Sequence, residues 1–126
     1  MREQMPATLT SVAAARHAVQ SFSANLEVDL DGISLAVSEA VSNVVAHAYP
    51  NGSPGVVEVS AAASPLELTV TVRDHGCGLD EVSRTPGAGF GLTIIRRVAQ
   101  HVELADTGDG VALTMGFRRG GPWSGR

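Results

Sequence analysis

Three short segments of this chain carry residue types that could bind a nucleotide. In the first, Glu39 and Asn43 stand four residues apart, and in the second Asp74 opens a run that contains two glycines. The third segment ends in alternating glycines followed by Leu92. Carboxylates and amides can bind a metal or move a proton, and glycines let a backbone approach a ligand. We expect the three segments to form one nucleotide pocket.

Glu39, Asn43 and His47 are spaced by four residues, which places them on one face of a helix. An ordinary solvated polar face is disfavoured because Ala36 and Ala40 stand between them and leave room for a ligand. The Asn43 amide oxygen can bind the Mg²⁺ of a nucleotide, and Glu39 can accept a proton from an attacking hydroxyl or orient a water. For His47, a structural role in the pocket wall or at the helix end is favoured over a catalytic one.

Asp74 follows a strand of alternating apolar residues, so it stands where a sheet meets a loop. A buried carboxylate there can accept a hydrogen bond from the exocyclic amine of adenine and so select adenine over guanine. The alternative is an aspartate that caps the turn before Gly76, which is a common arrangement. Gly76 and Gly78 allow backbone angles or close approaches that side chains forbid.

The third segment, with Gly87, Gly89 and Gly91, precedes a predicted helix. Free backbone amides at a helix start, together with the helix dipole, favour a phosphate. A dinucleotide-binding βαβ unit is excluded, because this loop comes late, follows another loop and is succeeded by a hairpin.

Apolar periodicity predicts the elements that must position these residues. We expect helices over about 10–25, capped by Thr10 or Ser11, over about 29–48, started by Asp29 or Asp31, and from about residue 91. The third helix should bury Leu92, Ile95, Val98 and Ala99. Alternating segments predict two hairpins, one joined by Ser64-Pro65 and one formed by strands 102–107 and 111–117. The predicted fold is α+β, a two-layer sandwich with helices on one face of a mostly antiparallel sheet.

Composition narrows the class of protein. The chain has 126 residues, of which 44% are hydrophobic, which suits one compact domain; we expect it over 1–118, with a flexible tail over 119–126. A net charge of −4 argues against direct nucleic-acid binding, and the absence of lysine excludes a P-loop. The single cysteine excludes an internal disulfide. Since neither a membrane span nor a signal peptide is apparent, we expect a cytoplasmic protein.

Together the three segments resemble the boxes of the GHKL ATPase superfamily, whose domains share the Bergerat ATP-binding fold. Glu39 and Asn43 match its asparagine box, and the two glycine segments match its two glycine boxes. The run 35–49 is most similar to bacterial anti-sigma-factor serine/threonine-protein kinases. By analogy, Glu39 is the catalytic base and Asn43 the magnesium ligand. The implied ATP-binding set is Asn43, Asp74, Gly76, Gly78, Gly87, Gly89, Gly91 and Leu92.

The resemblance implies an ATP- and Mg²⁺-binding kinase that phosphorylates a STAS-type anti-sigma-factor antagonist, sequesters a sigma factor and forms a homodimer. Two features depart from the family pattern. Val111 stands where many relatives carry Thr, which predicts the loss of a water-mediated adenine contact. Only eight residues separate Gly78 from Gly87, and among them only Arg84 is cationic and could reach the γ-phosphate.

Two other functions compete with the kinase. One is an ATP-gated binding module without phosphotransfer, which the short lid favours and Glu39 disfavours, since burying a carboxylate beside phosphates is costly. The other is the catalytic domain of a sensor histidine kinase, which is disfavoured because the chain shows no phosphoacceptor helix. The sequence does not identify the sigma factor or the STAS substrate.

Overall fold

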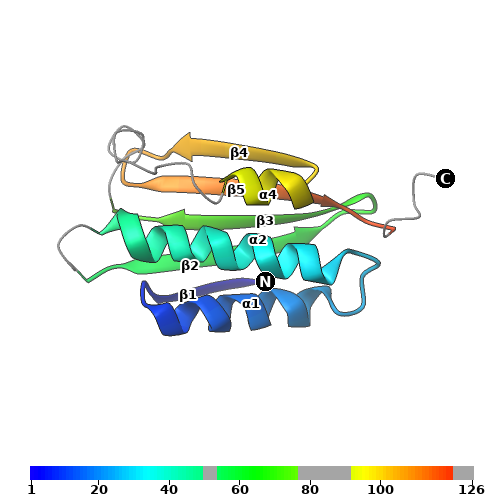
Figure 1. The fold of residues 1–126 in the computed structure, drawn as a ribbon, viewed down its shortest axis with the longest axis horizontal. Helices are drawn as coiled ribbons and strands as arrows, with labels where there is room; N and C mark the ends of the chain where they lie inside the picture. Colours follow the sequence, from blue (N-terminus) through cyan, green and yellow to red (C-terminus); the bar gives the residue numbers. More distant parts are fainter. Residues whose placement is uncertain (50–53, 77–91, 121–126) are drawn as a thin grey trace.

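Strands β1 to β5 form one antiparallel sheet in the order β1-β2-β3-β5-β4, and helices lie against one of its faces (Figure 1). The computed structural model describes residues 1–49, 54–76 and 92–120. The strands are β1 (Arg2–Pro6), β2 (Val56–Ala63), β3 (Glu67–Asp74), β4 (His101–Asp106) and β5 (Val111–Arg118). The helices are α1 (Leu9–Ser23), α2 (Leu30–Asn43) and α4 (Leu92–Val98), and a π-helical segment, η1 (Val44–Ala48), continues α2. The expected α+β two-layer sandwich is confirmed.

Both predicted hairpins are present, as β2 with β3 and β4 with β5. Strands β2 and β3 and the first half of β5 alternate buried and partly exposed residues, as a sheet with one covered face requires, whereas β4 is largely exposed. The sequence analysis does not predict β1. This strand pairs with β2 at the sheet edge, with Glu3 opposite Val59, and only Met5 among its residues is partly buried. A charged edge strand shows little apolar alternation and discourages pairing with other chains.

Helices α1 and α2 begin in different ways, and of the two only α2 has a side-chain cap at its start. At α2 the side chain of Asp29 accepts a hydrogen bond from the Gly32 amide at 3.0 Å, so Asp29 rather than Asp31 is the cap. The prediction that Thr10 or Ser11 caps α1 is wrong, because the helix begins at Leu9 after Thr8, which makes no side-chain cap hydrogen bond. Helix α2 with η1 ends at Ala48, as the sequence predicts.

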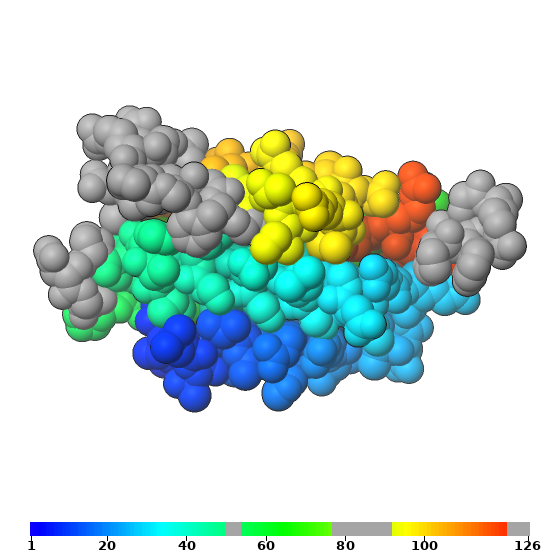
Figure 2. Space-filling view, in the orientation of Figure 1, coloured from blue at the N-terminus to red at the C-terminus, as the bar shows by residue number. Residues whose placement is uncertain are grey.

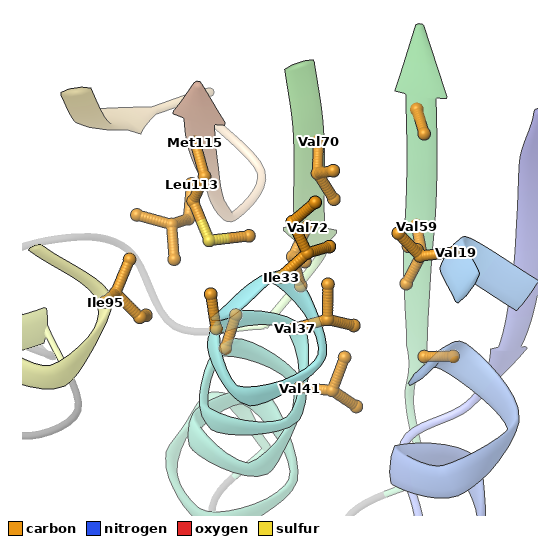
Figure 3. Close-up of a cluster of buried hydrophobic side chains, with 14 of the residues drawn as sticks. Val19, Ile33, Val37, Val41, Val59, Val70, Val72, Ile95, Leu113 and Met115 are labelled. Carbon is orange, nitrogen blue, oxygen red and sulfur yellow. The ribbon is translucent and has the colours of Figure 1, made fainter. Parts of the chain in front are cut away.

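The core lies between the sheet and the helices, and it fixes α2 over β3 (Figure 3). Ile33, Val37 and Val41 of α2 face Val70 and Val72 of β3. On one side Val19 of α1 lies near Val59 of β2, and on the other Ile95 of α4 faces β5. Of the residues predicted to be buried in α4, Ile95 is fully buried, and the remaining ones are partly buried against the core.

The predicted boundary between a domain over 1–118 and a tail stays a prediction. The first two tail residues donate backbone hydrogen bonds, from Arg119 to Leu66 at 2.9 Å and from Gly120 to Glu27 at 2.6 Å. Residues 121–126 lie outside the described part of the chain. Among the helices that the structure describes, none has the length and apolarity needed to cross a membrane.

Candidate functional site

The described residues of the predicted site come from α2, from the end of β3 with Gly76 just after it, and from the start of α4; α2 with η1 and β3 end on the same side of the molecule (Figure 1). Glu39 and Asn43 lie on α2 and are partly buried, and Asp74 is the last residue of β3. Leu92 is the first residue of α4 and packs against the core. The remaining predicted residues, Gly78, Arg84, Gly87, Gly89 and Gly91, lie outside the described residues.

The prediction that Ala36 and Ala40 leave room for a ligand is wrong. Their exposed fractions are 0% and 2%, and both belong to the hydrophobic core. The physical reason is that α2 lies between α1 and α4 in the helix layer, so both of its flanks are covered (Figure 2). A Cβ added at Gly32, one turn before Ala36, would lie 3.3 Å from Val98 Cβ of α4. The small residues therefore let α4 pack closely.

Asp74 is buried, with 5% of its surface exposed, and one of its oxygens joins two neighbouring segments. Its Oδ1 accepts hydrogen bonds from the backbone amides of Gly76 at 3.0 Å and of Val111 at 3.3 Å. Asp74 therefore caps the turn before Gly76, as the alternative interpretation of this aspartate predicts. Both hydrogen bonds that the structure shows to this carboxylate, within the described residues, end on Oδ1 and not on Oδ2.

Burial raises the pKa of Asp74 above its ordinary value, because a carboxylate loses solvation inside the protein. The two backbone hydrogen bonds lower the pKa and oppose this effect, but they do not cancel it. A ligand that donates a hydrogen bond to Oδ2 would favour the charged form and offset part of the cost of burial.

Two glycines let backbone segments meet around Asp74. A Cβ at Gly76 would overlap the carbonyl oxygen of Ala48 at the end of η1. A Cβ at Gly110 would overlap the carbonyl oxygen of Asp74 itself. The end of η1, the end of β3 and the start of β5 are therefore in backbone contact at this point. One-turn π-helical segments often occur at functional sites, and η1 leads directly into this contact.

Three side chains that the sequence analysis did not assign to the site lie around Asp74. The Tyr49 hydroxyl donates to the Val56 carbonyl and accepts from the His75 amide at 3.0 Å. The His75 ring nitrogen Nδ1 lies 3.2 Å from Asp109 Oδ2. Spacing along the sequence gives little sign of these contacts, since His75 is 26 residues from Tyr49 and 34 from Asp109.

Asp109, in the turn between β4 and β5, is contacted by the side chains of Thr107, Arg73 and His75. Thr107 donates to its Oδ1 at 3.0 Å, and Arg73 Nη2 lies 3.5 Å from the same oxygen. The hydrogen bond from Thr107, followed by that from His75, lowers the pKa of Asp109. The carboxylate thus links this turn to the end of β3, beside Asp74.

His47 lies in η1, is partly buried and makes contacts of its own. Its predicted structural role stays a prediction. The arrangement as a whole presents a buried acceptor at the end of β3 and, on α2, a carboxylate and an amide one turn apart. The acceptor can bind a base that carries a hydrogen-bond donor, and the carboxylate and amide can bind a metal ion that accompanies a phosphate.

A scan of known protein families matches residues 5–117 to the histidine kinase-like ATPase domain. The chain belongs to this family. An anti-sigma F factor from Anoxybacillus flavithermus is 33% identical over 118 residues, which are 82% of this chain and 81% of that protein. The resemblance to GHKL anti-sigma-factor kinases is thereby confirmed, and ATP binding is the activity that the family implies.

Two solved structures show the same fold. The RsbU and RsbW domains of a Mycobacterium tuberculosis protein superpose with a TM-score of 0.67 at 20% identity, covering 94% of this chain and 32% of that one. The catalytic domain of histidine kinase ThkA superposes with a TM-score of 0.63 at 15% identity, covering 95% of this chain and 99% of that domain. The match thus extends over nearly the whole of the ThkA domain and about a third of the Mycobacterium structure.

Proposed function

We propose that this chain is an ATP- and Mg²⁺-dependent serine/threonine-protein kinase that phosphorylates a STAS-type anti-sigma-factor antagonist and sequesters a sigma factor. The observation that carries the proposal is the 33% identity to an anti-sigma F factor over four fifths of both chains, on a histidine kinase-like ATPase domain. The proposal extends to a cytoplasmic homodimer, as the family resemblance implies.

Asp74 is proposed to bind the base. Its Oδ2 would accept a hydrogen bond from the exocyclic amine of adenine, while Oδ1 stays bonded to the amides of Gly76 and Val111. Guanine carries an oxygen acceptor in place of that amine, so a carboxylate selects against it. The glycine segment before α4, with Leu92, is proposed to approach the phosphates, and Arg84 the γ-phosphate.

Asn43 and Glu39 are proposed to act at the phosphate end. Within residues 1–49, 54–76 and 92–120 no group of three or more metal-binding side chains occurs, so a magnesium ion bound by Asn43 would take most ligands from phosphates and water. Glu39 would accept the proton of the serine hydroxyl. The serine oxygen then bonds to the γ-phosphorus, the bond from that phosphorus to the β–γ bridging oxygen breaks, and ADP leaves.

A transfer assay tests the proposal. Purified chain, radiolabelled ATP and Mg²⁺ are incubated with each STAS-domain protein of the source genome, and a labelled serine or threonine is sought by mass spectrometry. We expect Glu39→Ala to lose transfer, by about 10²-fold or more, while ATP still binds. Glu103→Ala, which removes an exposed carboxylate on β4, is the matched control and should transfer normally.

The outcomes distinguish the two candidate functions. Unchanged transfer by Glu39→Ala would contradict the role of this carboxylate as the base. Measurable ATP binding without labelling of any STAS protein would support the ATP-gated binding module instead. In that case a nucleotide-dependent complex with a sigma factor, seen by size-exclusion chromatography, would remain the expected activity.

A further inference from the structure

Tyr49 connects three segments at the base-binding end of the site. We propose that Tyr49 is a positioning residue that sets the preference of the pocket for adenine, acting through the backbone of His75. The inference rests on the proposed ATP site, in which Asp74 reads the base. The two hydrogen-bond partners of the Tyr49 hydroxyl are Val56 and His75, so its effect on Asp74 would pass through the backbone of the next residue.

The Tyr49 hydroxyl donates to one segment of the chain and accepts from another. It donates to the Val56 carbonyl at the start of β2 and accepts from the amide of His75, directly after β3. The ring is fixed as well, because it lies so close to Gly55 that a Cβ there would overlap it. A side chain held at its ring and its hydroxyl has little freedom, so it can fix the backbone position of His75.

The side chain of His75 is fixed from the opposite direction. Its Nδ1 lies 3.2 Å from Asp109 Oδ2, and Thr107 donates to the other oxygen of Asp109 at 3.0 Å. His75 is thus attached through its main chain to Tyr49, which follows η1, and through its side chain to the β4–β5 turn. With Oδ1 of Asp74 engaged by two amides, this double attachment determines where Oδ2 points.

The position of Tyr49 in the chain gives the contact a second consequence. Tyr49 directly follows η1, which continues the helix that carries Glu39 and Asn43. Its hydrogen bond to His75 therefore links the helix proposed to serve the phosphates with the strand proposed to read the base. Loss of this bond should make the orientation of Asp74 relative to the helix less well defined. Binding of the nucleobase should weaken as a result, more than binding of the phosphates.

Tyr49→Phe tests the inference, because it keeps the ring over Gly55 and removes only the hydroxyl. Binding of ATP and of GTP would be measured by calorimetry, together with thermal unfolding. The substitution removes both hydrogen bonds of the hydroxyl, and the one to His75 is the one expected to affect the base. We expect ATP binding to weaken about fivefold, the size of effect typical of a single hydrogen bond, and GTP binding to change less, so that the preference for ATP falls. The control is Glu67→Gln. It disrupts a histidine–carboxylate pair like that of His75 with Asp109, His101 Nε2 to Glu67 Oε2 at 2.9 Å, but at the opposite end of β3.

A second variant tests whether the effect passes through His75. Asp109→Asn alters the contact on the other side of the same residue, so its effect on the ATP preference should not add to that of Tyr49→Phe in the double variant. An unchanged ATP-to-GTP ratio in Tyr49→Phe, or equal weakening of both nucleotides with a lower melting temperature, would overturn the inference. Additive losses would contradict a common route through His75. Failure of the unmodified chain to bind ATP would instead refute the proposed function.

Discussion

Replacing Asp74 by Asn should separate the structural role of this side chain from its proposed role in reading adenine. Asparagine keeps the oxygen that accepts from the amides of Gly76 and Val111, at 3.0 and 3.3 Å, so the turn and the start of β5 keep their hydrogen bonds. The other oxygen becomes an amide nitrogen, which donates and cannot accept from adenine. Leaving a buried donor without its partner costs about 1–3 kcal/mol, so ATP should bind about 5- to 150-fold more weakly.

The same substitution should change how the stability of the ligand-free protein depends on pH. The pKa of Asp74 is raised in the folded state above its ordinary value of 3.8, so the folded state binds this proton more tightly than the unfolded chain does. The stabilising contribution is fully present below pH 3.8 and is lost as the pH rises through the folded-state pKa. The unmodified protein should therefore lose stability relative to Asp74→Asn as the pH rises from about 3 to about 7.

Urea denaturation followed by circular dichroism measures this difference, with ATP titrations on the same samples. Asp109, whose pKa is lowered, contributes in the opposite direction but is common to both proteins, so it cancels in the comparison. Asp74→Ala is the reference for lost hydrogen bonds and should destabilise by at least about 2 kcal/mol, because two backbone amides lose their acceptor. Destabilisation of Asp74→Asn to the same extent, or unchanged ATP affinity, would refute the reasoning.

Two further predictions concern the elements that support the site. Gly76→Ala should lower the free energy of unfolding by about 1–3 kcal/mol and weaken ATP binding, because its Cβ would overlap the Ala48 carbonyl. Chemical denaturation would measure the loss of stability, and an unchanged midpoint would contradict the close approach of the two backbone segments. Asp29→Ala should destabilise by ~1 kcal/mol through loss of the cap on Gly32, whereas Asp31→Ala, exposed in the same first turn, should cost less. Equal effects of the two in thermal unfolding would argue against the cap.

The sequence predicts most of the sheet because one of its faces is covered. In β3 every second residue is buried, and Val72 pairs with Val59 of β2 and with Leu113 of β5. Such alternation is a local signal that a sequence reveals directly. Strand β1 lacks it, because it forms through pairing with β2 at a charged edge. The misreading of Ala36 and Ala40 has a similar cause, since nothing local to α2 shows that α4 covers that flank.

The candidate site likewise contains features that have a local signal in the sequence and contacts that have none. Asp74 could be predicted because its position after a strand and before two glycines is a local feature. The contacts of Tyr49 and Asp109 with His75 join residues far apart in the chain, and one partner of Tyr49 is a backbone amide, which any residue type supplies. Residue identity therefore reveals the acceptor that could read a base, but not the contacts that orient it.

Val111 contacts Asp74 through its backbone amide, a contact that its residue type does not indicate. The sequence predicts that valine here loses a contact to adenine that threonine would make through water, and this stays a prediction. The amide of Val111 nevertheless donates to Asp74 Oδ1 at 3.3 Å, and Gly110 places that amide there by packing against the Asp74 carbonyl. Because the donor is main chain, the attachment of β5 to Asp74 does not depend on the side chain at position 111. The orientation of the carboxylate proposed to read the base is thus a property of how β3, β5 and η1 meet, and a substitution at position 111 should alter it only if it moves the strand.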